Sequence, residues 1–221
     1  NEEWGIRYKE VKLDLPKLLK KKLGIVDELT KGIDFLFKKN KVTKYIGTAK
    51  ILSPNEIEIM TDEKTEIINA DKIIIATGSE PTNLPNINVD EKKIVTSTGA
   101  LELDKVPQKM VVIGAGIIGL EMGTVWRRLG AEVEVVEYMP RILPGIDDEI
   151  AKNFMKILQK QGIKFKLGYS VEKAKIEKDK VLLSIKDVNN NTLNELVADV
   201  ALVSVGRKPN NNGLGLDKLN L

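Results

Sequence analysis

Two residue types that carry much of enzyme chemistry are missing from this chain. Its 221 residues include no cysteine and no histidine. The absence of cysteine excludes a disulfide, a thiolate nucleophile and a cysteine-ligated metal. The absence of histidine removes the usual general base near neutral pH and the usual zinc ligand. We therefore predict no ordinary redox or hydrolytic side-chain chemistry and no metal site within this sequence.

Net charge and aromatic content are also low. There are 35 Lys and Arg against 32 Asp and Glu, a formal charge of +3, and aromatic residues make up 5%. This balance does not indicate a nucleic-acid partner. The most apolar run, Val111 to Leu120, contains three glycines and ends at Glu121, so no membrane partner is expected. The hydrophobic content of 42% is enough for a globular core.

The two ends of the sequence lack the usual features of a complete chain. It begins at Asn1 without an initiator methionine and stops at Leu221 without a recognisable final element. We therefore expect an internal piece of a longer protein.

The first part of the sequence has the pattern of a helix followed by a small antiparallel sheet. Apolar residues recur with a helical period over residues 14–40, and Pro16 suits the first turn of a helix. Short β-rich runs separated by turn residues predict strands at residues 42–46, 49–52, 56–60 and 65–68. A fully apolar strand is predicted at residues 72–76.

From Met110 onwards strands and helices alternate, which predicts a parallel α/β sheet. Pro81 and Pro85 mark a boundary before this region. The predicted strands are residues 110–113, 132–137, 164–167 and 199–205, and the predicted helices are residues 116–129 and 147–161. Residues 171–176, 181–186 and 195–197 have the pattern of an antiparallel meander.

The most specific motif is Gly-x-Gly-x-x-Gly, formed by Gly114, Gly116 and Gly119. It follows a predicted strand and opens a predicted helix, which is the context that dinucleotide binding requires. Gly114 permits the tight turn, Gly116 lets the backbone approach a pyrophosphate, and Gly119 lets the helix pack on the strand. The free amides at the start of the helix then face the phosphates. A tight turn without a ligand is the alternative.

Glu137 ends the second predicted strand, 18 residues after Gly119. An acidic residue about 20 positions after the glycines accepts hydrogen bonds from the adenosine ribose and repels a 2′-phosphate. The first cation after it is Arg141, so the sequence favours NAD over NADP. An exposed glutamate at a strand end is the alternative. Glu121, in the first turns of the helix, is by its spacing alone more typical of a surface residue.

Together these residues resemble the flavoprotein disulfide reductases that bind two dinucleotides, and among them most closely the dihydrolipoamide dehydrogenases. The resemblance covers essentially the whole chain and is carried by residues 76–79, 106–121, 159–165 and 205–210, with further similarity at 29–33 and 36–42. It implies an α/β fold: a Rossmann-like three-layer FAD/NAD(P)-binding domain with an antiparallel meander, plus a partial second domain of the same type.

The resemblance also implies a division of the chain. Residues 1–79 resemble the second half of an FAD-binding domain, residues 80–206 a complete NAD-binding domain, and residues 207–221 the start of the return segment to the FAD or central domain. The family's FAD glycine motif and redox cysteine pair are expected upstream of Asn1. The flavin-binding Gly-Asp and the His-Glu base pair are expected beyond Leu221.

Carried over position by position, the resemblance implies one set of NAD contacts and one set of flavin-side remnants. The implied NAD-binding residues are Gly114, Gly116, Ile117, Ile118, Gly119, Glu121, Glu137, Val171 and Gly206. Glu121 matches the family's glutamate near the nicotinamide, and Val171 and Gly206 border the adenine or its ribose. The flavin-side positions are Gly47, Ala76, Thr77, Gly78 and Arg207.

In the implied full-length enzyme, dihydrolipoamide reduces the disulfide, the dithiol reduces FAD, and the flavin gives hydride to NAD⁺. This chain would supply the NAD platform, contain no catalytic residue and lack turnover alone. The implied partners are NAD(H), dihydrolipoamide and subunits of 2-oxo acid dehydrogenase complexes. The full-length protein is expected to be a homodimer and the fragment a monomer, in bacterial cytoplasm or the mitochondrial matrix. A sibling reductase or NADH oxidase and a stand-alone NAD-binding module are the alternatives.

Overall fold

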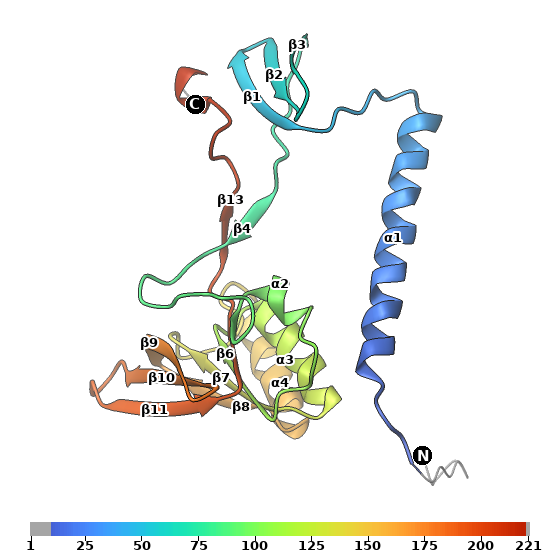
Figure 1. Ribbon diagram of the computed structural model, residues 1–221. Helices are drawn as coiled ribbons and strands as arrows, with labels where there is room; N and C mark the ends of the chain where they lie inside the picture. The colour runs from blue at the N-terminus through green and yellow to red at the C-terminus, as the bar shows by residue number, and fades with distance from the viewer. Residues whose placement is uncertain (1–9, 220–221) are drawn as a thin grey trace. The chain divides into compact units, whose positions relative to one another are not determined.

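The computed structural model describes residues 10–219, and these divide into two compact units (Figure 1). One unit consists of Pro81–Gly206 together with the chain up to Lys20. The other consists of Lys21–Glu80 and the residues from Arg207 onwards. Each unit is described below by itself.

The unit that contains Pro81–Gly206 is built on a five-stranded parallel sheet. Its strands, in spatial order, are β5 (Ile94–Val95), β12 (Val200–Val203), β6 (Lys109–Ile113), β7 (Glu132–Glu137) and β8 (Lys164–Leu167). One face is covered by α2 (Ser97–Ala100), α3 (Ile117–Leu129) and α4 (Asp148–Lys160), and the other by the antiparallel meander β9 (Tyr169–Glu177), β10 (Lys180–Asp187) and β11 (Leu193–Ala198). The predicted three-layer α/β fold is confirmed.

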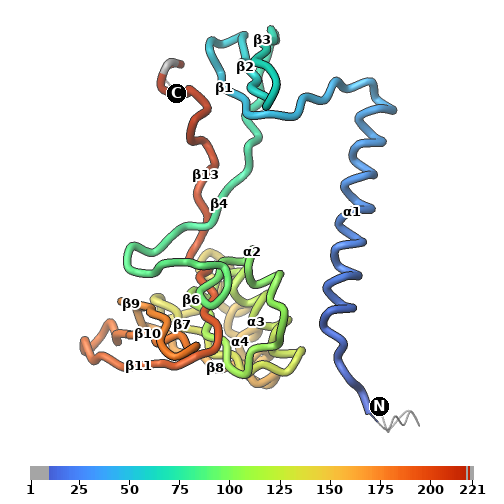
Figure 2. The backbone as a smooth tube through the Cα atoms, viewed as in Figure 1, coloured from blue at the N-terminus to red at the C-terminus, as the bar shows by residue number. Residues whose placement is uncertain are grey.

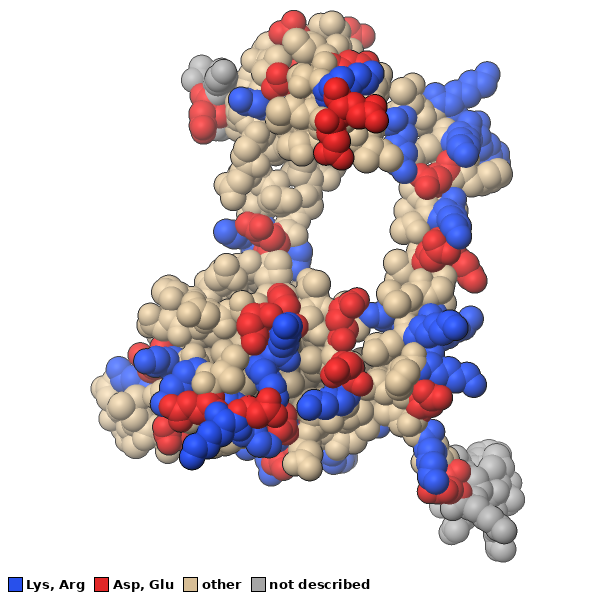
Figure 3. Space-filling model, viewed as in Figure 1, with Lys and Arg blue, Asp and Glu red and all other residues tan. Residues whose placement is uncertain are grey.

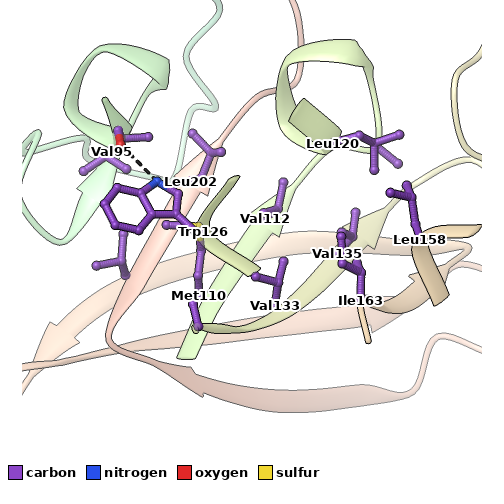
Figure 4. Close-up of a cluster of buried hydrophobic side chains, with 14 of the residues drawn as sticks. Val95, Met110, Val112, Leu120, Trp126, Val133, Val135, Leu158, Ile163 and Leu202 are labelled. Atoms are coloured by element: carbon purple, nitrogen blue, oxygen red, sulfur yellow. Dashed lines mark hydrogen bonds between the residues drawn. The ribbon is translucent and has the colours of Figure 1, made fainter. Parts of the chain in front are cut away.

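Alternating side chains of the central strands supply two separate cores. Met110 and Val112 of β6 point toward the helices, where they pack with Trp126 of α3 and Leu158 of α4 (Figure 4). Val111 and Ile113 of β6 point the other way, onto the meander. A parallel strand buried on both faces needs a continuous apolar run, and this is why the strands were recognisable in the sequence. The Trp126 indole N–H donates to the Ala100 carbonyl at 3.0 Å, so its polar atom is satisfied in this core.

Polar caps and glycines set the ends of the helices in this unit. The Asp147 carboxylate accepts from the amides of Glu149 (2.9 Å) and Ile150 (3.2 Å), which starts α4. Gly130 ends α3 in the left-handed conformation, with φ of 115°. Both features agree with the helix ends expected from the sequence.

The other unit contains a three-stranded antiparallel sheet. Its strands are β1 (Thr48–Ser53), β2 (Glu56–Met60) and β3 (Thr65–Asn69), in that order, and the 3₁₀ helix η2 (Leu216–Leu219) lies beside β1. The Ile51 amide donates to the Leu214 carbonyl at 2.8 Å, which ties the segment after Arg207 to this sheet.

Helix α1 (Leu15–Lys39) precedes this sheet along the chain. It agrees with the helix predicted at residues 14–40, and Leu15, in its first turn, is buried. Most of its apolar stripe is exposed, for example Leu29 (66%) and Phe35 (64%).

Two predicted strands are wrong. Residues 42–46 and 72–76 have no regular secondary structure, and Ile74 is 88% exposed. Their composition is β-rich, but a strand requires a neighbour to accept and donate its backbone hydrogen bonds. No strand of the described residues pairs with either segment.

A short ribbon that the sequence did not predict lies where the chain passes between its units. Strand β4 (Ser79–Pro81) pairs with β13 (Arg207–Pro209), and the two lie side by side in Figure 2. The Asn210 amide donates to the Gly78 carbonyl and the Thr82 amide to the Gly206 carbonyl, both at 3.0 Å, so the strands run in opposite directions. Their partners are more than 120 residues apart in sequence, and each strand is too short to give a periodic signal.

Charges of both signs are mixed on the surface. On the face drawn in Figure 3, Lys and Arg side chains alternate with Asp and Glu over the α/β unit and do not gather into a patch of one sign. Among the described residues, no helix is both long and apolar enough to cross a bilayer.

The Asp199 carboxylate, at the start of β12, forms hydrogen bonds with residues of β6 and β10. Its carboxylate accepts from the Lys109 amide at 2.8 Å and from the Lys180 ammonium at 2.6 Å. Burial raises the pKa of Asp199, but the Lys180 and Lys109 hydrogen bonds outweigh burial and leave the pKa below the ordinary value of an aspartate. Because the folded pKa is lowered, this stabilisation is present above the unfolded value and is lost as pH falls through the folded value.

We predict that Asp199→Ala lowers the free energy of unfolding by about 1–3 kcal/mol at pH 7, because two charge-assisted hydrogen bonds are lost. Urea unfolding followed by circular dichroism checks this. The difference from wild type should shrink at acid pH and vanish as pH falls through the lowered pKa of folded Asp199. The exposed Asp104→Ala is the control, and an equal loss at Asp104 would contradict the assignment.

Candidate nucleotide-binding site

The glycine-rich turn lies between β6 and α3, at the carboxyl end of the parallel strands. Gly114 has φ of 101°, and a Cβ there would lie 2.6 Å from the Ser204 carbonyl oxygen. A Cβ at Gly119 would clash with the Gly114 carbonyl oxygen. Both glycines are therefore required by the fold itself, through backbone conformation and close packing.

Gly116 differs from its two neighbours. Its backbone is extended, with φ of −77° and ψ of 180°, a conformation open to any residue. No heavy atom of the protein lies within 4 Å of where its Cβ would be. Neither conformation nor packing within the described residues requires glycine at this position. The missing side chain leaves open space directly in front of the first turn of α3.

The start of α3 offers backbone donors to that space. Gly116 is the N-cap, and no described side chain caps the helix. The first amides of an α-helix have no partner within the helix and carry the positive end of its dipole. Ile117 is 61% exposed and Ile118 is half-buried, so this end of the helix is accessible.

The Glu137 carboxylate lies directly against the glycine-rich turn. The side chain, at the end of β7, is buried. Its Oε2 accepts from the Ala115 amide at 2.6 Å, and its Oε1 accepts from the Met139 amide at 2.8 Å. Parallel pairing of β6 with β7 brings the two strand ends together. The structure thus joins two features that lie more than 20 residues apart in sequence.

Two further groups hold the turn, and the sequence did not reveal them. The Leu143 amide donates to the Ala115 carbonyl at 3.0 Å, so the peptide units on both sides of the Ala115 Cα are each held by a hydrogen bond. The Ser204 hydroxyl donates to the Ile113 carbonyl at 2.9 Å and the Gly114 carbonyl at 3.2 Å. The turn-forming sequence Leu143-Pro144-Gly145 was the only available signal for the first of these.

The remaining residues expected at the NAD site are more dispersed. Glu121 is exposed on α3, just beyond the first turn. Gly206 is exposed with φ of 128°, two residues after Ser204. Val171 in β9 is half-buried against the core cluster that contains Ile113 and Val136. No described contact joins Glu121 or Val171 to the turn.

The flavin-side positions lie in the other unit and bond to their own neighbours. A Cβ at Gly47 would lie 2.5 Å from the Met60 carbonyl oxygen, so the fold explains that glycine. The Thr77 hydroxyl donates to the Asn210 carbonyl at 2.5 Å, next to Ala76 and Gly78. The Arg207 guanidinium donates to the Ser79 hydroxyl at 2.7 Å and also to the Ser79 carbonyl.

No group of three or more acidic residues in the described part of the chain is placed to hold a metal ion.

Comparison with known proteins gives the family. Residues 3–221 match the family described as pyridine nucleotide-disulphide oxidoreductase. The chain belongs to this family. The resemblance inferred from residues 76–79, 106–121, 159–165 and 205–210 is thereby confirmed.

Curated relatives carry names from within the same family. The chain is 49% identical over 216 residues to dihydrolipoyl dehydrogenase 1, mitochondrial, of Arabidopsis thaliana, covering 97% of this chain and 43% of that protein. It is 48% identical over 219 residues to the dihydrolipoamide dehydrogenase of Chaetomium thermophilum, covering 98% and 44%. It is 47% identical over 216 residues to a leghemoglobin reductase of Glycine max, covering 97% and 41%. The chain thus spans less than half the length of these relatives.

Solved structures agree on the fold. A Cu(II) complex of a variant of the HOCl-induced flavoprotein disulfide reductase RclA from Escherichia coli matches with a TM-score of 0.80 and 25% identity. The match covers 91% of this chain and 45% of that one. Another structure of the HOCl-induced flavoprotein disulfide reductase RclA from Escherichia coli gives a TM-score of 0.77 at 23% identity, covering 93% of this chain and 46% of that one.

The three glycines give a testable contrast in stability. We predict that Gly114→Ala lowers the free energy of unfolding by about 2 kcal/mol or more, because the new Cβ meets the Ser204 carbonyl at a positive φ. Gly116→Ala should change it by less than about 1 kcal/mol, because its Cβ enters open space. Chemical denaturation of both variants checks this, and equal losses would contradict the geometry described for Gly116.

Proposed function

We propose that the α/β unit binds NAD at the glycine-rich turn. The observation that carries the proposal is the open space at Gly116, where neither backbone conformation nor packing requires a glycine. A ligand that approaches the backbone closely at this point accounts for the absence of a side chain. Membership of a family named for pyridine nucleotides supports this choice of ligand.

The residues present fit such a cofactor. The amides of Gly116, Ile117 and Ile118 would hold the pyrophosphate, because anions are stabilised at an uncapped helix N-terminus. Glu137 would accept hydrogen bonds from the adenosine ribose, since each carboxylate oxygen that bonds a backbone amide retains a second lone pair. Glu121, Val171 and Gly206 remain proposed contacts near the nicotinamide and the adenosine. The bound nicotinamide supplies the hydride acceptor.

NAD fits this site better than NADP. A 2′-phosphate would lie against the buried Glu137 carboxylate, where like charges repel. The first cation after Glu137 is already engaged, because the Arg141 guanidinium pairs with Asp148 and donates to the Ile146 carbonyl. No other Lys or Arg lies in the segment 138–147.

For the whole protein we propose dihydrolipoyl dehydrogenase activity. Dihydrolipoamide would reduce a disulfide, the dithiol would reduce FAD, and the electrons would pass to NAD⁺ held on this chain. The names of relatives at 48–49% identity support this reaction. The redox cysteines and the histidine base of that reaction are absent from this sequence, and we propose that its part is the NAD platform.

We also propose a domain division, flavin-side residues, an oligomeric state and a compartment for the whole protein. We propose a division into an NAD-binding domain at 80–206 and parts of an FAD-binding domain at 1–79 and 207–221. The unit boundaries at Pro81 and Gly206 support it, whereas the chain up to Lys20 groups with the α/β unit. The flavin-side roles of Gly47, Ala76, Thr77, Gly78 and Arg207 remain proposals, as do a homodimer and association with 2-oxo acid dehydrogenase subunits. The mitochondrial names of relatives support the mitochondrial matrix as its compartment.

We predict that NAD(H) raises the melting temperature of the chain more than NADP(H) at equal concentration, because only NADP(H) places a phosphate against Glu137. Glu137→Gln should reduce NAD affinity about tenfold and lower the preference, since the charge and one amide contact are lost. Thermal shift and calorimetric titration check both outcomes. Equal shifts with the two nucleotides in wild type would contradict the role given to Glu137.

The open space at Gly116 gives a second test. Gly116→Val should abolish the NAD-dependent thermal shift, because its side chain would occupy the space proposed for the pyrophosphate. The melting temperature without nucleotide should stay close to that of wild type. A variant that folds and still binds NAD with wild-type affinity would rule out this site.

A further inference from the structure

The segment between β7 and α4, residues 138–147, is hydrogen-bonded to the glycine-rich turn. Its Leu143 amide donates to the Ala115 carbonyl at 3.0 Å, while the Glu137 carboxylate binds the amide of the same residue. Both bonds fix the peptide units immediately before Gly116, whose amide is proposed to receive the pyrophosphate. The position of this segment therefore bears directly on the geometry of the turn.

Leu143 makes its bond from an unfavourable backbone conformation. Its φ is 50°, in the left-handed region that a leucine rarely adopts. Such a conformation persists only where the surrounding structure imposes it. The adjacent Gly145, with φ of 95°, takes a positive φ without this cost. Something other than local preference must hold Leu143 in place.

The Arg141 side chain supplies that restraint. Its guanidinium pairs with Asp148 at the start of α4 and donates to the Ile146 carbonyl. Longer contacts of 3.5 Å reach the carbonyls of Ile142 and Leu143. The planar guanidinium has five donors and can bind several oxygens at once, which a lysine cannot do in the same geometry. One side chain thus binds both sides of the loop that contains Leu143.

We propose that Arg141 is a positioning residue for the nucleotide site. It holds residues 138–147 in the conformation in which Leu143 donates to Ala115, and so it pre-orders the turn that receives the pyrophosphate. The side chain acts through Leu143 and makes no contact with the nucleotide. This inference rests on the proposed NAD binding, and one of its tests below does not depend on nucleotide.

Arg141→Met tests the proposal, because methionine keeps an unbranched side chain and removes every donor. We expect the Kd for NAD to rise about tenfold, with the ratio of NAD to NADP affinity unchanged. Without nucleotide, amide hydrogen exchange measured by NMR should accelerate at Leu143 and Ala115. Arg128→Met, at the other end of α3, removes the same charge and should change neither quantity.

A second substitution separates positioning from general support of the fold. Glycine adopts a positive φ without strain, so Leu143→Gly in the Arg141→Met background should restore the Kd to within about threefold of wild type. A structural role elsewhere in the unit would not be rescued in this way. Rescue, together with slower amide exchange at position 143 than in the Arg141→Met variant, supports the proposal.

Three results would overturn it. The first is a Kd of Arg141→Met for NAD within twofold of wild type. The second is a loss of affinity for NADP but not for NAD. The third is a loss of NAD affinity with unchanged amide exchange at Leu143 and no rescue by Leu143→Gly. If Arg141→Met does not fold, Asp148→Asn replaces it, with an expected threefold rise in Kd and faster Leu143 exchange, and no change in either overturns the proposal. Failure of wild-type NAD binding would instead reject the proposed function, while the exchange measurements would still test the link from Arg141 to Leu143.

Discussion

The backbone of Ala115 is the point on which the proposed site depends. The Glu137 carboxylate binds the N–H of the peptide unit before the Ala115 Cα, and the Leu143 amide binds the carbonyl of the unit after it. Neither peptide unit can rotate without breaking its hydrogen bond. A turn that must present backbone donors to a ligand gains little if it is free to move, because ordering it on binding costs conformational entropy. Here that cost is met during folding. The same carboxylate that sets the electrostatic character of the site also fixes its shape.

The sheet makes this arrangement possible. Parallel pairing of β6 with β7 places the end of one strand, which becomes the glycine-rich turn, beside the end of the next, which carries Glu137. The two strands are buried on both faces, by α3 and α4 on one side and the β9–β11 meander on the other. The packed sheet therefore holds the two strand ends that carry the turn and Glu137 in fixed positions. Ligand sites at the carboxyl ends of parallel strands follow from this general geometry.

Much of this could be predicted from local sequence pattern. The apolar run of β6, the three glycines and the distance to Glu137 are short-range signals, and each corresponds to a feature of the folded chain. The strand expected at residues 72–76 fails because pairing partners are a property of the whole fold and not of composition. The β4–β13 ribbon is missed for the same reason. Leu143-Pro144-Gly145 indicates a turn, but nothing in a leucine indicates the positive φ with which Leu143 reaches Ala115.

The ribbon of β4 and β13 has a consequence for how such chains can change over time. The Thr82 amide bonds the Gly206 carbonyl, so the segment between them begins and ends at neighbouring points. A stretch of chain with adjacent ends can be exchanged, duplicated or replaced as one module without new linkers. The stretch from Thr82 to Gly206 can then be replaced as one unit while the sequences on either side remain as they were. The ends of this replaceable stretch are marked by the four residues whose backbones bond across the ribbon, Gly78, Thr82, Gly206 and Asn210.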